Sequence, residues 1–150
     1  MPLIDLTIPE GALSDETREA LLPDLMERML KWEGAPDNDF FRSITWIHVH
    51  ELPVQNVTSA GAPVTEPIFR LNITVPEGAL SERRKAGLAD DLTKAVLEHT
   101  GLADDPSAPL RVWVVIGEVK DGNWAAAGQI VRFGDLVKAA QGEREALPAG

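Results

Sequence analysis

The hexapeptide PEGALS occurs twice in this chain of 150 residues, at Pro9–Ser14 and again at Pro76–Ser81, an offset of 67 positions. Beyond the hexapeptide the same offset aligns the chain with itself without a gap, and roughly 18 of the 60 aligned positions are identical. A register kept over such a length indicates a tandem duplication, with repeats at 2–61 and 69–128. The identical pairs include Leu21 and Leu88, Asp24 and Asp91, Trp46 and Trp113, Glu51 and Glu118, and Asn56 and Asn123.

Each repeat has the pattern of a β-α-β unit. Ser14 and Ser81 are residues that cap the start of a helix, and Gly34 and Gly101 are residues that end one. Between them, apolar residues recur at helical spacing. Short segments rich in β-branched residues flank each helix and predict strands at 3–8, 43–52, 69–75 and 110–119.

Two such units predict an α+β fold, in which a four-stranded sheet carries two helices on one face. We expect one domain, residues 1–141, whose repeats are joined by a linker at 53–66. A short final helix is predicted at 133–141 and a flexible tail at 142–150. The second face of the sheet should be bare and apolar, so the chain should associate with copies of itself.

Composition excludes several classes of protein. The formal charge of −10 argues against a nucleic-acid partner, because such binding depends on Lys and Arg that neutralise phosphates. No apolar run approaches the ~20 residues of a membrane span. The chain has no cysteine, hence no disulfide and no thiolate chemistry. The first residues lack the pattern of a signal peptide, so we expect a cytoplasmic protein with no membrane partner.

The arrangement resembles the tautomerase superfamily, most of all its 4-oxalocrotonate tautomerase (4-OT) group. The resemblance covers about 2–128 and rests on Pro2 after the initiator Met, on a strand followed by Glu-Gly and a capped helix, and on the stretch VWVVIGEVKDGNWAAAG. It implies β-α-β units, an N-terminal proline as catalytic group, no cofactor, and fused pairs that assemble as homotrimers. Phe69 stands where Pro2 stands in the first repeat, which implies one active site per chain.

The chemistry expected of Pro2 follows from its nitrogen. Removal of Met1 would expose a secondary amine, and an α-amino group ordinarily titrates near a pKa of about 7.7–8.0. Burial in an apolar pocket would lower that pKa. Such an amine can take a proton from the carbon next to a carbonyl group and return it elsewhere.

The sequence departs from the family pattern at the arginines that hold a substrate carboxylate there. Ala12 and Ala79 follow Glu-Gly, and Trp46 and Trp113 open the second strands, where the resemblance implies arginine. The aromatic residue of the closing turn is kept as Trp124. Our candidates for substrate binding are therefore Trp124, Asn123, Arg111, Trp113, Arg70 and His50.

His48 and His50 alternate along one strand and so share a face. They would make half of a metal site, but no third ligand is evident in the sequence, and we expect no metal.

The first functional hypothesis is a Pro2-dependent tautomerase or isomerase that acts on a small enolisable carbonyl compound, without cofactor. A Trp-lined pocket without the arginines favours a substrate that is less anionic or that bears an aromatic ring. The alternatives are a hydratase, dehalogenase or decarboxylase of the same superfamily, and a non-catalytic trimeric binding protein. The family's water-activating acid is replaced by Ala126 and Ser59, which counts against the first alternative.

Overall fold

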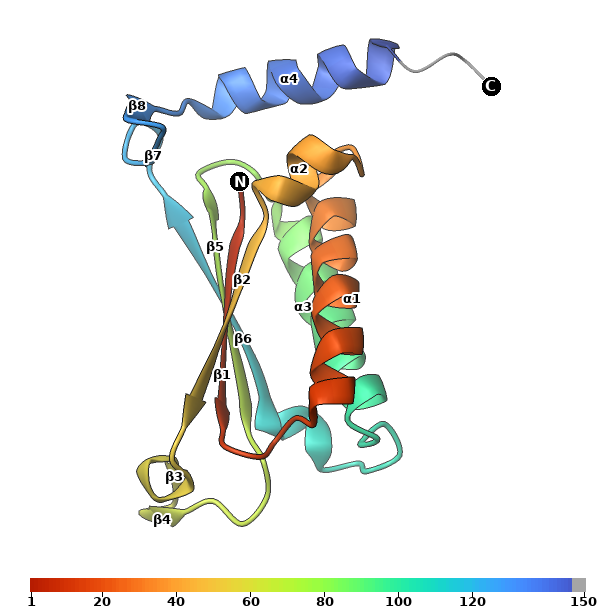
Figure 1. The fold of residues 1–150 in the computed structure, drawn as a ribbon, viewed down its shortest axis with the longest axis vertical. Helices are drawn as coiled ribbons and strands as arrows, with labels where there is room; N and C mark the ends of the chain where they lie inside the picture. The colour runs from red at the N-terminus through yellow and green to blue at the C-terminus, as the bar shows by residue number, and fades with distance from the viewer. Residues whose placement is uncertain (147–150) are drawn as a thin grey trace.

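The computed structural model describes residues 1–146 and shows one mixed four-stranded sheet with helices on one face (Figure 1). The strand order is β2-β1-β5-β6. The two inner strands pair antiparallel, and each outer strand is parallel to its inner neighbour. The predicted α+β fold is confirmed. The strands are β1 (Leu3–Pro9), β2 (Trp46–Leu52), β5 (Phe69–Pro76) and β6 (Val112–Val119).

The two long helices, α1 (Asp15–Glu33) and α3 (Glu82–His99), lie side by side on the sheet (Figure 1). The predicted caps form: the Ser14 hydroxyl accepts from the Thr17 amide, and the Ser81 hydroxyl accepts from the Arg84 amide. Gly34 ends α1 with a φ of 70°, a conformation that favours glycine. α1 continues through Pro23 without ending there.

The core lies between the sheet and the two helices. In the inner strands β1 and β5 the helix-facing residues are buried and alternate with exposed or partly buried neighbours, whereas in the outer strands β2 and β6 most helix-facing residues are only partly buried. One stripe of each helix supplies the other half of the core. The buried set includes Ile4, Leu6, Ile8, Leu71, Ile73, Val75, Leu21, Leu25, Leu88 and Leu92.

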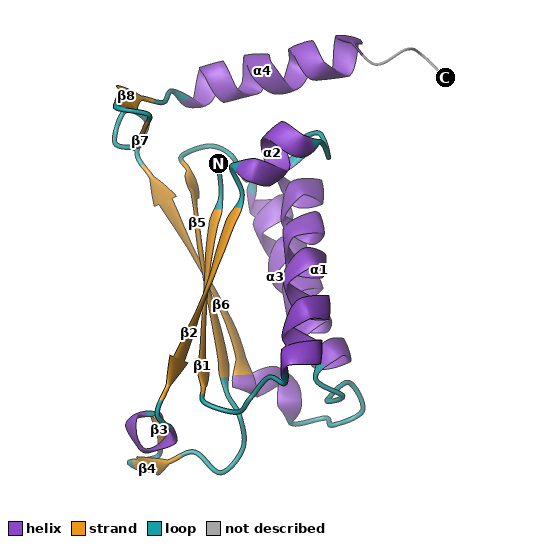
Figure 2. Cartoon of the chain, viewed as in Figure 1, coloured by secondary structure: helices purple, strands orange, loops and turns teal. Residues whose placement is uncertain are grey.

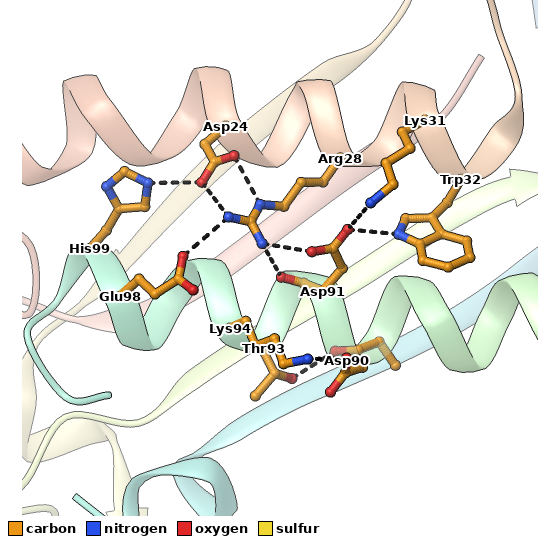
Figure 3. Close-up of polar contacts among 11 residues, drawn as sticks. Asp24, Arg28, Lys31, Trp32, Asp90, Asp91, Thr93, Lys94, Glu98 and His99 are labelled. Atoms are coloured by element: carbon orange, nitrogen blue, oxygen red, sulfur yellow. Dashed lines mark hydrogen bonds and ion pairs between the residues drawn. The ribbon is translucent and has the colours of Figure 1, made fainter. Parts of the chain in front are cut away.

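A polar network crosses the interface between α1 and α3 (Figure 3). The Arg28 guanidinium donates to both oxygens of Asp24 and to Asp91, at 2.7–3.0 Å. Its Nη2 also reaches Glu98, at 3.2 Å. Asp24 and Asp91 are equivalent positions of the two repeats, so one arginine joins the repeats across their approximate symmetry axis.

Each repeat closes with a small β-hairpin, and the two hairpins lie at opposite ends of the sheet because β2 and β6 run in opposite directions (Figure 2). Ala60 and Ala127 both have a φ of 52° and each precedes a glycine with positive φ, so the repeats match even in turn geometry. The elements are η1 (Val54–Asn56), β3 (Thr58–Ser59) and β4 (Ala62–Pro63) in the first repeat, and β7 (Ala125–Ala126) and β8 (Gln129–Ile130) in the second.

Two helices lie outside the repeat pattern. The short α2 (Asp39–Ser43) begins at Asn38, whose side chain accepts from the Phe41 amide; we had expected a loop there. The final helix, α4 (Phe133–Ala146), passes across the end of the sheet where the N-terminus lies (Figure 1). It continues beyond Gln141, where we expected a tail to begin, and residues 147–150 lie outside the described part. A further 3-10 turn, η2 (Ala108–Arg111), precedes β6.

The face of the sheet away from the helices, called the open face below, is not the bare apolar surface that we expected. Trp46, Trp113 and Val115 are exposed there, with 62%, 66% and 49% of their surface accessible. The alternation of the strands places polar side chains beside them, and these are Asp5, Thr7, His48, His50, Arg70, Asn72 and Thr74. Within residues 1–146, no helix combines the length and the apolar character that a membrane crossing requires.

Candidate active site

A cavity of about 220 Å³ lies beside the N-terminus, and we call it the N-terminal cavity. Both repeats and α4 contribute to it, because the antiparallel pairing of β1 with β5 places the start of the first repeat beside the second PEGALS segment. Its lining includes Met1, Glu33, Phe41, Pro76, Ala79, Arg84, Phe133 and Leu136.

Pro2 is buried directly behind Met1, and Met1, not Pro2, lines the cavity in this structure. Its carbonyl oxygen accepts from the Trp46 amide at 3.1 Å, and the next residue, Leu3, pairs with both Trp46 and Thr74. Backbone pairing on both sides therefore fixes the position of Pro2. Met1 lines the cavity, so its removal would enlarge the space beside Pro2 and leave the Pro2 nitrogen as the terminal amine.

The electrostatics of the cavity favour a neutral amine. Burial lowers the pKa of the amino group of Met1, the N-terminal residue in this structure, although the nearby charge of Glu33 acts in the opposite direction. Burial also raises the pKa of the Glu33 carboxyl group, and the amine partly offsets that rise. The cavity thus holds an amine that is a weaker base than usual and a carboxyl group, Glu33, that is a weaker acid than usual, and the charges of the two groups interact.

Arg84 supplies the cationic side chain that lines the cavity. Its Nη1 donates to the Glu33 carbonyl oxygen at 3.2 Å, and its guanidinium lies against Gly34, where an added Cβ would be 3.0 Å from Nη2. The end of α1 therefore holds this guanidinium in place. Within residues 1–142, no other arginine or lysine lines this cavity.

Trp124 is the one sequence candidate that the chain itself brings to the N-terminus. It lines a smaller adjacent cavity together with Met1, Pro76, Phe133 and Leu136. The carbonyl oxygen of Trp124 accepts from the Val131 amide at 2.9 Å within the β7–β8 hairpin, which fixes the position of its backbone. Asn123 precedes it in an exposed turn, with its amide donating to the Lys120 carbonyl oxygen.

The other candidates lie away from the N-terminal cavity within the chain. Pro2 lies beside the C-terminal end of β5, whereas Arg70 and Trp113 pair with each other at the starts of β5 and β6. The Arg70 Nε donates to the Asn72 side chain at 2.9 Å. The Arg111 guanidinium forms ion pairs with Glu66 and Asp105. His50, near the far end of β2, contacts Asp5.

Sequence reasoning missed Glu33, Arg84 and Phe133. Glu33 carried a usable signal, because it directly precedes the Gly34 cap. In a β-α-β unit with parallel strands the helix must end near the start of the first strand, which places Glu33 near Pro2. Arg84 and Phe133 carried no comparable signal, since the packing of the second repeat and of α4 against the first determines where they lie.

Comparison with known proteins agrees with this geometry. Residues 70–134 match the family model described as Tautomerase enzyme. A solved structure of a fused 4-OT designated Q0, a symmetric trimer, covers 93% of this chain and 98% of its own, with a TM-score of 0.70 and 21% identity. The second repeat, at 70–134, therefore matches the tautomerase family, and the chain as a whole has the tautomerase fold.

Two further structures share this tautomerase fold. Pt0534, solved after inactivation by 2-oxo-3-pentynoate, is 26% identical with a TM-score of 0.71, over 85% of this chain and 94% of its own. N1, a member of the cis-3-chloroacrylic acid dehalogenase family, is 19% identical with a TM-score of 0.73, and the match covers 97% of this chain and 92% of N1. A sequence search of curated proteins gave no significant match. These comparisons establish the tautomerase fold of the chain, and they do not establish the reaction.

Proposed function

We propose that this protein is a cofactor-free tautomerase in which Pro2, freed by removal of Met1, acts as general base on a small enolisable carbonyl compound. The observation that carries the proposal is the N-terminal cavity, in which burial lowers the pKa of the Met1 amine; we expect the same surroundings to lower the pKa of the Pro2 amine once Met1 is removed. A base that is neutral near physiological pH accepts protons without first having to lose one.

We assign different steps of the reaction to different residues of the cavity. The Pro2 nitrogen takes a proton from the carbon next to the substrate carbonyl, and the electron pair of that C–H bond moves to form an enolate. Glu33, whose raised pKa favours its protonated form, or Arg84 donates a hydrogen bond to the developing oxyanion. The proton held by Pro2 then returns to the enolate oxygen or to a more distant carbon, which restores the free amine.

The lining favours a substrate with an apolar or aromatic part. Phe41, Phe133 and Leu136 surround the cavity, and Trp124 lies next to it. Among the side chains that the structure describes, those of residues 1–142, Arg84 is the one cation that would meet a carboxylate there, since Ala12 and Ala79 replace the arginines that the family resemblance implied. A substrate of the phenylenolpyruvate kind, or a neutral aryl ketone, fits this mixture.

Glu33 favours a second candidate, a hydratase or dehalogenase. We discounted this class because no acid follows Trp124, but Glu33 supplies a carboxyl group to the same cavity from α1. Its ionised form would activate a water molecule for addition to an unsaturated acid. The two candidates require opposite protonation states of Glu33, and so they predict different responses to its replacement.

The proposal includes a homotrimer. The open face exposes the large apolar side chains Trp46, Trp113 and Val115, and contact with another chain would bury them. Q0 and other fused 4-OT structures are trimers. In such an assembly Arg70 and Trp113 would be available to the cavity of a neighbouring chain. Arg111 is already held by two carboxylates, and His50 by Asp5.

The decisive experiment labels the base. 2-Oxo-3-pentynoate inactivates Pt0534, and its alkyne carbon β to the ketone accepts an amine with no leaving group. Mass spectrometry should show one added reagent mass per chain, on the N-terminal peptide that begins at Pro2. A form that retains Met1 should be inert to the reagent and inactive in a keto–enol absorbance assay. Equal turnover by both forms would remove Pro2 from the mechanism, and no turnover by either form would favour a non-catalytic use of the fold.

A further inference from the structure

The open face carries a cluster that the proposed activity does not use. His48 and His50 alternate along β2, and Asp5 lies directly opposite His48 in the parallel register of β1 and β2. Their ligand atoms all lie within 4.8 Å of one another. Asp5 is the third ligand that the sequence did not reveal, because only strand pairing brings it to the two histidines.

We propose that Asp5, His48 and His50 bind one divalent transition-metal ion per chain. Both imidazoles converge on the same carboxylate oxygen, Oδ1 of Asp5. His50 Nε2 lies 2.6 Å from it, and His48 Nδ1 lies 3.5 Å from it. An ion with bonds of about 2.0–2.2 Å holds its ligand atoms about 3–3.5 Å apart, so His48 already fits and His50 needs a small outward rotation.

Aromatic packing restrains the histidines in this arrangement. The Trp46 ring lies 6.3 Å from the His48 ring, and the His48 ring lies 6.1 Å from the His50 ring at an angle of 81°. The three side chains form a row along one strand, so rotation of the central His48 is limited on both sides. Such restraint reduces the entropy lost when a metal binds.

The second repeat shows that the cluster is not a by-product of the duplication. At the positions equivalent to Asp5, His48 and His50 it carries Asn72, Val115 and Gly117. Neither Val115 nor Gly117 has a ligand atom in its side chain. The three ligands therefore occur together in the first repeat alone, which predicts one ion per chain rather than two.

The donor set indicates which ions fit. Two imidazoles and one carboxylate suit Zn²⁺, Ni²⁺, Cu²⁺ or Fe²⁺, whereas Mg²⁺ and Ca²⁺ prefer oxygen ligands alone. Three protein ligands leave coordination positions for water or a small ligand or, in the proposed trimer, for a group of the neighbouring chain that covers the open face. This site lies away from the N-terminal cavity, and its existence does not depend on the proposed tautomerase activity.

The test is titration of metal-free protein with ZnCl₂ by calorimetry, near pH 7.5 in 0.15 M NaCl. We expect one ion per chain. Loss even of an outer-shell partner costs a metal site 10–100-fold in affinity, so His48→Ala, His50→Ala and Asp5→Asn should each weaken binding by at least about tenfold. His99→Ala is the matched control: its ring bonds to Asp24 between the helices, so it should leave Zn²⁺ binding unchanged.

A second readout uses Trp46. Bound Cu²⁺ quenches nearby indoles, so Cu²⁺ should quench part of the tryptophan fluorescence, and Trp46→Phe should abolish that part while Zn²⁺ still binds. Independently of any variant, Zn²⁺ should shift the ring NMR signals of two histidines and leave the third unchanged. The proposal is overturned if Zn²⁺ fails to bind, if the His48 and His50 variants bind as tightly as the parent, or if all three histidine signals shift alike.

Discussion

The indole of Trp32 lies directly over Gly87, so that a Cβ added to this glycine would be 2.1 Å from the ring. Trp32 ends the apolar stripe of α1, and Gly87 lies in the second turn of α3, within the contact between the two repeats. The same indole donates its Nε1–H to Asp91 at 2.9 Å. The close approach of the helices therefore depends on the absence of a side chain at this position.

Gly87→Ala should destabilise the protein. At a solvent-exposed helical position, replacing glycine by alanine would stabilise a protein by about 1 kcal/mol. Here the clash with the Trp32 ring, which its hydrogen bond to Asp91 restrains, should outweigh that gain and lower the free energy of unfolding by about 1–3 kcal/mol in total. Urea unfolding measures the change. Gly142→Ala is the control, because a Cβ there meets nothing within 4 Å. If both variants are stabilised alike, Trp32 moves freely and the packing argument is wrong.

Arg28→Ala should lower the free energy of unfolding by about 2–3 kcal/mol at neutral pH, because two partly buried carboxylates lose a charged donor. The exposed Arg83→Ala should change it little.

The effect should depend on pH. The hydrogen bonds from Arg28 hold the pKa of Asp24 below its usual value. Burial acts to raise the pKa of Asp91, but donors from Trp32, Lys31 and Arg28 bring it below its usual value. A depressed folded-state pKa stabilises the protein above the unfolded-state pKa and loses that effect as the pH falls through the folded value. The difference in the free energy of unfolding between the parent and Arg28→Ala should therefore become smaller below about pH 4. A difference in the free energy of unfolding that stays constant with pH would show that the lowered pKa values of Asp24 and Asp91 do not depend on Arg28.

Glu33→Gln should separate the two candidate reactions and shift the pH profile. In this structure the charge of an ionised Glu33 raises the pKa of the Met1 amine, and we expect the same effect on the Pro2 amine, so loss of that charge should move the ionisation in the rate profile to lower pH. A tautomerase should retain a substantial share of its rate, because Gln still donates a hydrogen bond. A hydratase that uses Glu33 as base should lose nearly all activity. Glu16→Gln, on the exposed start of α1, should alter neither property.

Trp124→Ala should reduce turnover with little change in the melting temperature, because the ring lines the smaller cavity beside Met1. An unchanged rate, with a lowered melting temperature instead, would give Trp124 a structural role.

Trp113→Ala should weaken the trimer rather than the monomer fold, since 66% of the residue is exposed on the open face. Loss of a central interface tryptophan costs about 2 kcal/mol or more. Light scattering during dilution should show dissociation at a higher concentration than in the parent. Leu110→Ala is the control, an apolar residue of η2 that is 82% exposed away from the strands. A parent that is monomeric at micromolar concentration would refute the trimer itself.

The repeat made most of the fold predictable. An unbroken register across 60 positions placed both helices, their serine caps and all four long strands, because local patterning and duplication pointed to the same answer. The sequence did not predict α2, whose five residues are too few for a periodic signal. Nor did it reveal that the open face is largely polar. We inferred an apolar face because a two-layer fold leaves one side of the sheet uncovered, and we did not use the alternation of polar residues within β1 and β5.

The candidate site was less accessible to sequence reasoning. Pro2 and Trp124 were found because a motif marks each of them. Glu33, Arg84 and Asp5 take their roles from contacts between segments far apart in the chain, and no local pattern marks such contacts. The histidine pair was recognised, but its carboxylate partner comes from another strand, 43 positions before His48.

The pairing of β1 with β5 also sets an order of events during synthesis. When the first repeat has left the ribosome, β1 has β2 on one side and an unpaired edge on the other, because its second partner begins only at Phe69. An unpaired edge beside exposed apolar side chains is prone to associate with other chains. Translation that stalls within 53–66 would prolong this state. The nascent chain is therefore most vulnerable to aggregation in the interval before the second repeat emerges.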